Sequence, residues 1–444
     1  MTGKALREAI QRSGGVFEEL YGPSSAETEQ RRYAGLVEGI LEDSPGGFPA
    51  AEFPETRGDL RVFTAPGRTE LGGNHTDHNR GKVLAASIQL DAVAVVAPRQ
   101  DKLVFFRSPG HRDVSVCLAK ADGSPDLAMR EEETGTTAAL VRGIAAELAR
   151  QSTAVGGFTA NAASTVLPGS GLSSSAAVEA LLGRIFDGLY GGGKRSALEL
   201  ARIGQIAENT YFGKPCGLED QIACASGGAV AIDFGDPARP LIRQIRFEPE
   251  AAGYALCVVD THGSHADLTA DYAAIPAEMK AVAALFGKEV LRELAPEQVL
   301  DRAAEIRKAA GDRALLRAIH FFNENRRVDA MLAALENKDF GRFLDLVNRS
   351  GESSATLLQN IYSPRQPAEQ GVSVALALTR DFIAAEAGGA GACRVHGGGF
   401  AGTIQTYMPL DRMDAYRRRM EGVFGAGSVT GLRIRPAGAV ELRF

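Results

Sequence analysis

The sequence has few cysteines, no excess of basic residues and no long apolar run, and each of these shortages excludes a class of protein. Its five cysteines contain no Cys-x-x-Cys pair, and such a sparse, odd-numbered set fits reduced thiols rather than a disulfide framework. Lysine and arginine number 49 against 55 acidic residues, and the net charge of -6 argues against nucleic acid as the main partner. No apolar run reaches the roughly 18 residues that cross a bilayer, and the N-terminus has no signal-peptide pattern. We therefore expect a cytoplasmic protein with neither a membrane nor a nucleic-acid partner.

What is present is a long chain with two parts of mixed secondary structure. Its 444 residues predict two or three domains, and 45% apolar residues are enough for large cores. Strand-like and helix-like segments alternate on both sides of a junction that contains Pro237 and Pro240, which predicts two α+β domains. The expected elements are helices over 4–43, strands at 61–65, 83–88, 92–97, 102–107 and 113–118, a helix at 136–150, a strand at 158–166, helices at about 174–190 and 194–211, strands at 227–234 and 254–260, helices over 266–387, a hairpin near 388–407, a helix at 411–423 and a closing strand pair.

A glycine- and serine-rich run at 167–177, Leu-Pro-Gly-Ser-Gly-Leu-Ser-Ser-Ser-Ala-Ala, is the most informative stretch of the chain. Its two glycines give the backbone freedom for a tight turn, and apolar residues at helical spacing follow directly. The start of a helix presents unpaired N–H groups at the positive end of the helix dipole, which suits a phosphate group. The alternative is an ordinary loop whose serine caps the helix.

A second motif, at 65–79, concentrates polar side chains in the run Ala-Pro-Gly-Arg-Thr-Glu-Leu-Gly-Gly-Asn-His-Thr-Asp-His-Asn. We interpret it as a turn between strands that binds a small ligand with many hydroxyl groups. Two alternatives stay open. One is a zinc site formed by His75, Asp77 and His78 with a further ligand, and the other is a solvated turn.

Two further motifs carry carboxylates and glycines. The run 213–221, Gly-Lys-Pro-Cys-Gly-Leu-Glu-Asp-Gln, ends in Glu219 and Asp220. Beside a cation such as Arg68, Asp220 would stay ionised and accept a proton from a substrate hydroxyl, whereas the simpler interpretation is a helix cap. In 395–402, Val-His-Gly-Gly-Gly-Phe-Ala-Gly, the glycines indicate either a backbone surface that another group approaches closely or a tight hairpin.

In their order and spacing the four motifs resemble those of the GHMP small-molecule kinases, and within them the galactokinases. The resemblance extends from about residue 59 to the end of the chain. It matches 65–79 to the signature Pro-Gly-Arg-x-x-x-x-Gly-x-His-Thr-Asp, and the three later motifs to the phosphate loop, the catalytic-aspartate loop and the C-terminal glycine loop. It implies an α+β fold with a ribosomal S5 domain 2-like domain at 56–245, a ferredoxin-like domain at 246–444 and the site between them. Residues 1–55 would form a helical extension packed on the N-terminal domain.

The resemblance also implies an activity, which is the ATP- and Mg²⁺-dependent phosphorylation of the C1 hydroxyl of galactose by a monomer or weak homodimer. Asp220 would be the base or would orient that hydroxyl, and Arg68 would keep Asp220 ionised and offset charge on the transferring phosphoryl group. The residues expected to bind the sugar are Asn74, His75, Asp77, Gly217 and Tyr272. Those expected to hold the triphosphate are Gly169, Ser170, Gly171, Leu172, Ser173, Ser174 and Ser175. Mg²⁺ would be bound by Ser175 and Glu208.

The first motif departs from the galactokinase pattern at several positions. Galactokinases usually carry Glu-His-Thr-Asp-Tyr where this chain has Asn74-His-Thr-Asp-His78, and Thr69-Glu70 replaces the usual Val-Asn. The usual Glu accepts a hydrogen bond from the sugar's C6 hydroxyl, whereas the uncharged Asn74 would tolerate a C6 carboxylate. A kinase for galacturonate or another C6-modified galactoside is therefore one alternative. Others are a non-catalytic galactose sensor and a kinase for homoserine, mevalonate or N-acetylgalactosamine.

Overall fold

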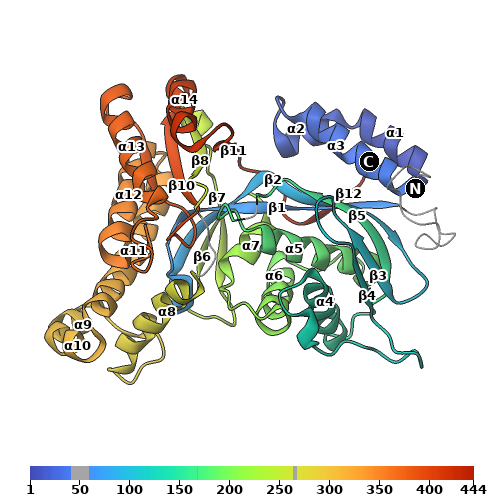
Figure 1. Ribbon diagram of the computed structural model, residues 1–444, viewed down its shortest axis with the longest axis horizontal. Helices are drawn as coiled ribbons and strands as arrows, with labels where there is room; N and C mark the ends of the chain where they lie inside the picture. Colours follow the sequence, from blue (N-terminus) through green and yellow to red (C-terminus); the bar gives the residue numbers. More distant parts are fainter. Residues whose placement is uncertain (42–59, 168, 264–267) are drawn as a thin grey trace.

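Two β-sheets organise the computed structural model, which describes residues 1–41, 60–167, 169–263 and 268–444 (Figure 1). The strands are β1 (Arg61–Gly72), β2 (Lys82–Pro98), β3 (Leu103–Arg107), β4 (Val114–Cys117), β5 (Phe158–Ser164), β6 (Ala229–Asp233), β7 (Leu241–Ile245), β8 (Tyr254–Asp260), β9 (Ala392–Val395), β10 (Thr403–Pro409), β11 (Val429–Leu432) and β12 (Val440–Leu442). The larger sheet has the order β12-β1-β2-β5-β3-β4, with β6 paired to β2 and β7 to β6, and the smaller sheet has the order β11-β8-β10-β9. Among the described strands, every pair is antiparallel except β3 with β5. Together with the helices, these sheets confirm the α+β class.

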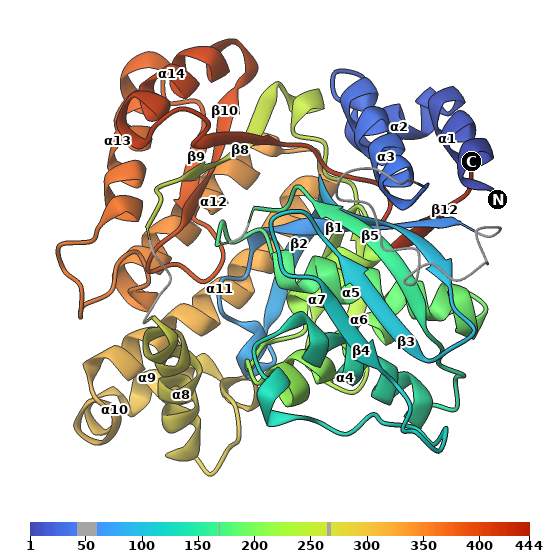
Figure 2. The same cartoon turned by 45° about the vertical axis from the view of Figure 1, so that its right-hand side comes forward.

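The helices pack around the two sheets. They are α1 (Gly3–Arg12), α2 (Gly14–Tyr21), α3 (Ala26–Leu41), α4 (Thr137–Arg150), α5 (Ser174–Phe186), α6 (Ala197–Ile206), α7 (Glu219–Ser226), α8 (Thr269–Ala284), α9 (Pro296–Asp301), α10 (Ala303–Ala310), α11 (Asp312–Glu336), α12 (Phe340–Ser353), α13 (Gly371–Glu386) and α14 (Met413–Phe424). Figures 1 and 2 show α4–α7 on one face of the larger sheet and α1–α3 on the other, with α12–α14 beside the smaller sheet. Helix α11 contacts β1 and β2 of the larger sheet as well as α12.

The two longest strands place the first polar motif differently from the prediction. Residues 65–72 continue β1 rather than forming a turn, and the turn begins at Gly73. The strands predicted at 83–88 and 92–97 are a single strand, β2, which faces β1 along most of its length. The pairing of β1 with β2 shifts register between Pro66 and Arg68, so the extra residues bulge and the ladder continues. A bulge of this kind carries no sequence signal that distinguishes it from a turn.

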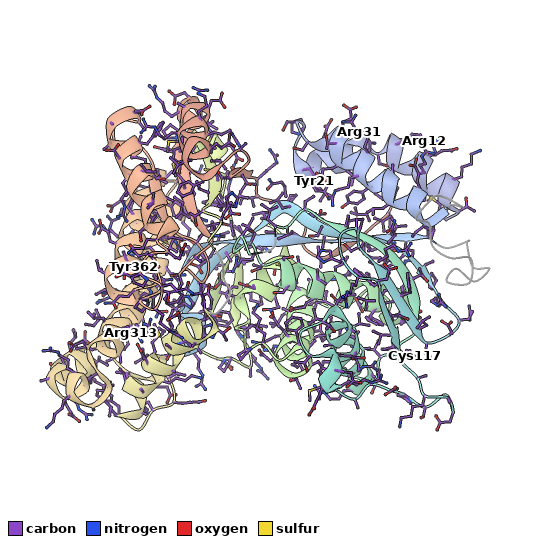
Figure 3. The ribbon with its side chains drawn as sticks, viewed as in Figure 1. Arg12, Tyr21, Arg31, Cys117, Arg313 and Tyr362 are labelled. Carbon is purple, nitrogen blue, oxygen red and sulfur yellow. The ribbon has the colours of Figure 1, made fainter. Side chains whose placement is uncertain are left out.

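The N-terminal helices are attached to the larger sheet by an apolar layer and a buried polar cluster. Side chains of α1–α3 pack against a layer that includes Val62, Val93 and Phe105. Beneath them the Asp91 carboxylate accepts a hydrogen bond from Tyr21, which points from α2 toward the sheet (Figure 3), at 2.6 Å. The same carboxylate binds Arg435 at 2.7 Å. The helical extension at 1–55 stays a prediction as a domain, and residues 42–55 of it lie outside the described part of the chain.

The end of the chain joins the two sheets, which corrects the prediction of a closing strand pair. β11 pairs with β8 in the smaller sheet, whereas β12 pairs with β1 in the larger one. Arg435, buried against Asp91, lies in the segment that crosses between them. The polar edge strand β7, which pairs with β6, was not predicted, because its exposed residues show little apolar alternation. The proposed domain limits at 245 and 246 stay a prediction.

Two features of the structure concern the cysteines and the apolar segments of the sequence. Cys117, Cys216, Cys224, Cys257 and Cys393 are all free thiols. In the part of the chain that the structure describes, no helix has the length and apolar character needed to cross a bilayer.

Candidate functional site

An ion pair between strand β1 and helix α7 lies at the centre of the site. Arg68 extends from β1, and Asp220 lies in the first turn of α7. The Asp220 Oδ1 atom is 2.8 Å from Arg68 Nε and 2.6 Å from Arg68 Nη2. The Arg68 side chain is 7% exposed and that of Asp220 is 36% exposed, so the carboxylate is the member that a substrate can reach. The expected meeting of these two side chains is confirmed, while their catalytic roles stay a prediction.

The surroundings of Asp220 keep it ionised. Burial raises the pKa of Asp220, but the Arg68 guanidinium and hydrogen bonds from Ser173 and Arg68 outweigh that effect and leave the pKa below its ordinary value. Burial likewise lowers the pKa of Arg68, and the charge of Asp220 more than restores it. The two groups therefore carry opposite charges at neutral pH. An ionised carboxylate of this kind can accept or orient the proton of a nearby hydroxyl group.

The phosphate-loop candidate lies directly beside this pair. The Arg68 guanidinium donates to the Gly171 carbonyl, and the Arg68 N–H donates to the Leu172 carbonyl at 3.0 Å. Helix α5 begins at Ser174, and its first turn, which holds Ser174 and Ser175, is half-buried. The start of α5 therefore lies beside the Arg68–Asp220 pair, and its role as an anion site stays a prediction.

Two serines of the loop make contacts that were not predicted. Ser173 precedes α5 in the left-handed conformation, with φ 60°, and its hydroxyl donates to Asp220 Oδ2 instead of capping the helix. Ser170 is buried, and its hydroxyl donates to the Leu167 carbonyl at 2.6 Å. The Ser173 contact joins the phosphate loop to the carboxylate, so the two motifs form one unit.

Glu208, one of the expected metal ligands, lies in a buried cluster of polar side chains. It belongs to a π-helical turn, Ala207–Phe212, and its carboxylate accepts from Lys214 Nζ at 3.1 Å and from Gln221 Nε2 at 3.0 Å. The same Gln221 amide donates to Glu179 at 3.1 Å. Glu179 lies one helical turn after Ser175, and its other oxygen has no hydrogen-bond partner among the described residues. Burial and the nearby Glu208 raise the pKa of Glu179.

Four of the five expected sugar ligands lie at the glycine loop or the aspartate loop. His75, at φ 58°, donates from Nε2 to the Gly398 carbonyl at 2.9 Å, and Tyr272 donates to the Gly399 carbonyl at 2.9 Å. Burial lowers the pKa of His75 to about 4, so the ring is neutral. A Cβ atom on Gly217 would lie 1.7 Å from Asp77 Oδ2, so only glycine allows the aspartate loop to approach Asp77 so closely.

Asn74, the remaining expected sugar ligand, faces the protein interior and is fully buried. Its Oδ1 atom accepts from Asn360 at 2.9 Å and from Ser354 at 3.3 Å. Its Nδ2 atom donates to the Gly397 carbonyl at 2.8 Å and lies 3.3 Å from both oxygens of Glu70. In this arrangement no hydrogen-bonding group of Asn74 is available to a sugar. The zinc alternative for the same turn finds no support either, since the described residues contain no group of three or more His, Cys, Asp and Glu side chains arranged as a metal site.

His396 is a residue of the site that sequence reasoning missed. The Glu70 N–H lies 3.4 Å from its Nε2, which is therefore an acceptor and also faces the Thr69 hydroxyl at 3.0 Å. Its Nδ1 then donates to Thr403 at 3.2 Å, and Thr403 donates to the Ser170 carbonyl at 2.7 Å. The chain of hydrogen bonds joins β1 to the phosphate loop. The motif around His396 was noted for its glycines, and a single buried histidine has no periodic signal.

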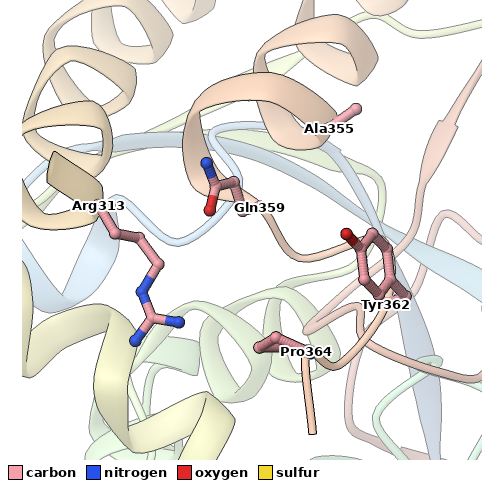
Figure 4. Close-up of a pocket in the computed structure, with 5 residues that line it drawn as sticks. All are labelled: Arg313, Ala355, Gln359, Tyr362 and Pro364. Carbon is pink, nitrogen blue, oxygen red and sulfur yellow. The ribbon is translucent and has the colours of Figure 1, made fainter. Parts of the chain in front are cut away.

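A hollow of about 260 Å³ has none of the predicted site residues in its lining. It lies where the π-helical turn Ser354–Leu358 and the residues after it face α11, and it is lined by Arg313, Ala355, Gln359, Tyr362 and Pro364 (Figure 4). Arg313 is already paired with Glu278 at 2.5 Å. We therefore assign no part of the chemistry to this hollow.

Comparison with known proteins identifies the family to which the chain is similar. The family model for the GHMP kinases N terminal domain matches residues 139–228, and the galactokinase galactose-binding signature matches residues 51–98. A galactokinase of Streptomyces coelicolor is 34% identical over 84% of this chain and 91% of its own length, and one of Mycobacterium tuberculosis is 33% identical over 79% and 89%. The solved structure of Lactococcus lactis galactokinase complexed with galactose superposes with a TM-score of 0.74 at 25% identity, covering 88% of this chain and 97% of that one. A mevalonate kinase structure, with a TM-score of 0.58 at 14% identity, shares the fold.

Proposed function

The chain belongs to the galactokinases of the GHMP kinase family, and we propose that it uses the Arg68–Asp220 pair to phosphorylate the C1 hydroxyl of galactose with ATP. The observation that carries this assignment of residues is the ion pair itself, held at 2.6 Å beside the start of α5. Phosphoryl transfer requires little covalent help from a protein; it requires in-line placement of the groups and compensation of the charge on the phosphoryl oxygens.

In this proposal Asp220 positions the nucleophile. The C1 hydroxyl of the sugar hydrogen-bonds to the exposed side of the Asp220 carboxylate, which accepts its proton as the oxygen bonds to the γ-phosphorus of ATP. The bond between that phosphorus and the bridging oxygen breaks in the same step, and ADP leaves. The Ser173 hydroxyl donates a hydrogen bond to Asp220 Oδ2 in this structure. The sugar hydroxyl would either replace this hydrogen bond or share the carboxylate with it. Arg68 keeps the carboxylate ionised and adds positive charge next to the transferring group.

The phosphate loop and Mg²⁺ supply the remaining charge compensation. The N–H groups at the start of α5, with Gly169, Gly171, Ser174 and Ser175 around them, would hold the triphosphate. Glu208 and the Ser175 hydroxyl would hold Mg²⁺. Mg²⁺ commonly binds through one or two carboxylates together with substrate phosphates and water. When bound, the ion would offset charge on the phosphoryl oxygens.

The sugar would lie between the turn after β1 and the glycine loop. His75, Asp77, Gly217 and Tyr272 all border that region, and the neutral His75 ring can donate or accept a hydrogen bond after it releases Gly398. The galacturonate alternative loses its basis, because it depended on Asn74 facing the sugar. The monomeric or weakly dimeric state stays a prediction.

An ADP-release assay with a panel of acceptors tests this function. Galactose should give the highest kcat/KM, with galacturonate, N-acetylgalactosamine, mevalonate and homoserine far below it, and phosphorus NMR should show a sugar 1-phosphate. Comparable turnover of galacturonate, or a phosphate at another hydroxyl, would contradict the proposal. EDTA should abolish ADP release and excess Mg²⁺ should restore it.

A further inference from the structure

Glu70, Asn74 and Arg394 form one buried cluster, which we call the Glu70 cluster. The Arg394 guanidinium donates to Glu70 Oε1, and Asn74 Nδ2 lies 3.3 Å from each oxygen of the same carboxylate. Glu70 is 3% exposed, and Asn74 and Arg394 are fully buried. A buried carboxylate needs a partner of opposite charge, so Glu70 and Arg394 depend on each other.

The amide of Asn74 is saturated by protein groups. An asparagine side chain offers two donor hydrogens and an oxygen that accepts two hydrogen bonds. Here the oxygen accepts from Asn360 and Ser354, while the NH₂ group donates to the Gly397 carbonyl and to Glu70. The backbone of the turn is held separately, because His320 donates to the Asn74 carbonyl at 2.9 Å. A sugar hydroxyl would have to displace a buried protein partner to reach Asn74.

The cluster joins three elements that border the sugar site. Glu70 lies on β1 two residues after Arg68, Arg394 lies on β9, and Asn74 contacts the first glycine of the glycine loop. His75, the neighbour of Asn74, contacts the next carbonyl of that loop at Gly398. The position of His75 and Asp77 relative to the glycine loop therefore depends on Asn74.

We propose that Asn74 is a positioning residue which does not touch the sugar, and that the carboxylate and the amide of the Glu70 cluster can exchange places. This proposal rests on the proposed function and refines its sugar site. It accounts for two sequence departures together, because galactokinases usually carry Asn at the position of Glu70 and Glu at that of Asn74. One carboxylate, one amide and one guanidinium are kept in either order. Arg394 Nη1 has no hydrogen-bond partner among the described residues, so the guanidinium has a donor left for a carboxylate at position 74.

A double-mutant cycle tests the exchange. Glu70→Asn leaves Arg394 without its anion, and Asn74→Glu places a second buried carboxylate beside the first. The double variant E70N/N74E restores one of each group. Its Tm should exceed the value expected from adding the two single changes, and its kcat/KM for galactose should exceed the product of the single effects by about tenfold or more. Additive Tm and kcat/KM values would overturn the proposal.

Asn79 offers a matched control for the cycle. It is also fully buried, but its partners are Met279 and the Leu291 N–H, outside the Glu70 cluster. The pair E70N/N79A should therefore show additive changes in Tm. If neither E70N nor N74E folds alone, recovery of a cooperative melt in E70N/N74E still supports the exchange, and failure of the double variant to fold contradicts it.

A second experiment tests whether Asn74 touches the sugar. The ratio of kcat/KM for galactose to that for 6-deoxygalactose should be the same in the wild type and in N74A or, if N74A does not fold, in N74S. A ratio that falls toward one in these variants would show a lost contact with the C6 hydroxyl and overturn the proposal. If the wild type releases no ADP with galactose, the proposed function fails instead, while the Tm cycle still tests the cluster.

Discussion

Arg68 and Asp220 lie 152 positions apart in the chain, and they meet because α7 packs directly on β1. Each side chain alone would be a poor choice for a buried position, since a buried charge is costly without its partner. Together they form a pair that is open to solvent on the carboxylate side. The same carboxylate also accepts a hydrogen bond from Ser173, so Arg68 and Ser173 together hold it in place and keep it ionised.

Ser173→Ala should shift the acid limb of the pH profile. Removing the hydroxyl removes a hydrogen bond that lowers the pKa of Asp220, so this pKa should rise toward its ordinary value. The kcat/KM for galactose should then begin to fall at a higher pH than in the wild type as the solution is made more acidic. A pH series of ADP release measures this, and an unchanged acid limb would show that Ser173 does not act on Asp220.

Gly217→Ala should weaken galactose binding. The added methyl group would overlap Asp77 Oδ2, so Asp77 or the aspartate loop must move. We expect KM for galactose to rise by about tenfold or more, in line with the cost of overpacking a close contact. Gly422→Ala, in α14, is the matched control, because nothing lies within 4 Å of its added carbon. Equal KM values in the two variants would contradict the close approach.

At the level of secondary-structure elements, contacts between segments far apart in the sequence hold the N-terminal helices and the chain end in place. The carboxylate of Asp91, in the middle of β2, accepts a hydrogen bond from Arg32 of α3 at 2.5 Å. It accepts another from Arg435, in the segment between β11 and β12, at 2.7 Å. Burial raises the pKa of Asp91, but the two guanidinium groups and the hydroxyls around it hold the pKa well below its usual range. One carboxylate thus joins three elements.

Asp91→Asn should be strongly destabilising, because it leaves the fully buried Arg435 guanidinium without its anion, whereas the partly exposed Arg32 keeps Glu29 as a partner. We expect a loss of about 3–5 kcal/mol in the free energy of unfolding. Urea or thermal unfolding measures the loss. Asp301→Asn, at an exposed position on α9, should change the free energy by about 0.5 kcal/mol or less. A loss as small for D91N would show that the cluster contributes little.

The sequence supports prediction of elements better than prediction of their partners. The helix after the serine run, the strand before it and the hairpin at 392–409 follow from local spacing and glycine positions. The crossing of the chain end from β11 to β12 does not, because it depends on Arg435 reaching Asp91, a contact between residues 344 positions apart. The resemblance to the galactokinase motifs implied that Arg68 lies beside Asp220. It could not show that Asn74 turns inward to Asn360, because that contact also joins residues far apart in the chain.

At the level of the whole molecule, two sets of buried titratable groups have opposite effects on the free energy of unfolding as pH changes. Burial lowers the pKa values of His75, His320 and His396, so the unfolded chain binds more protons than the folded one below about pH 6.5, and stability is lost as pH falls. Burial raises the pKa values of Glu179 and Glu219, so the folded protein keeps protons that the unfolded chain releases, and their contribution is lost as pH rises.

Variants should separate these two contributions. In His320→Gln the free energy of unfolding should fall less than in the wild type between pH 7 and 5, by about 1 kcal/mol per pH unit at most. In Glu219→Gln it should fall more. His111→Gln, at an exposed position, is the control and should keep the wild-type slope. Identical slopes in all four proteins, measured by chemical unfolding, would contradict the assigned pKa directions.

The central claim, that the Asp220 carboxylate activates the C1 hydroxyl of galactose, is tested most directly by the kcat of Asp220→Asn. The amide keeps the size of the side chain and an oxygen to face Arg68, but it cannot take a proton. Asp122→Asn, at an exposed carboxylate, is the control. With a cooperative melt retained, D220N should lose about 100-fold or more in kcat for ATP-dependent galactose phosphorylation, with a smaller change in KM. A folded D220N protein that retains the kcat of the wild type would contradict the account.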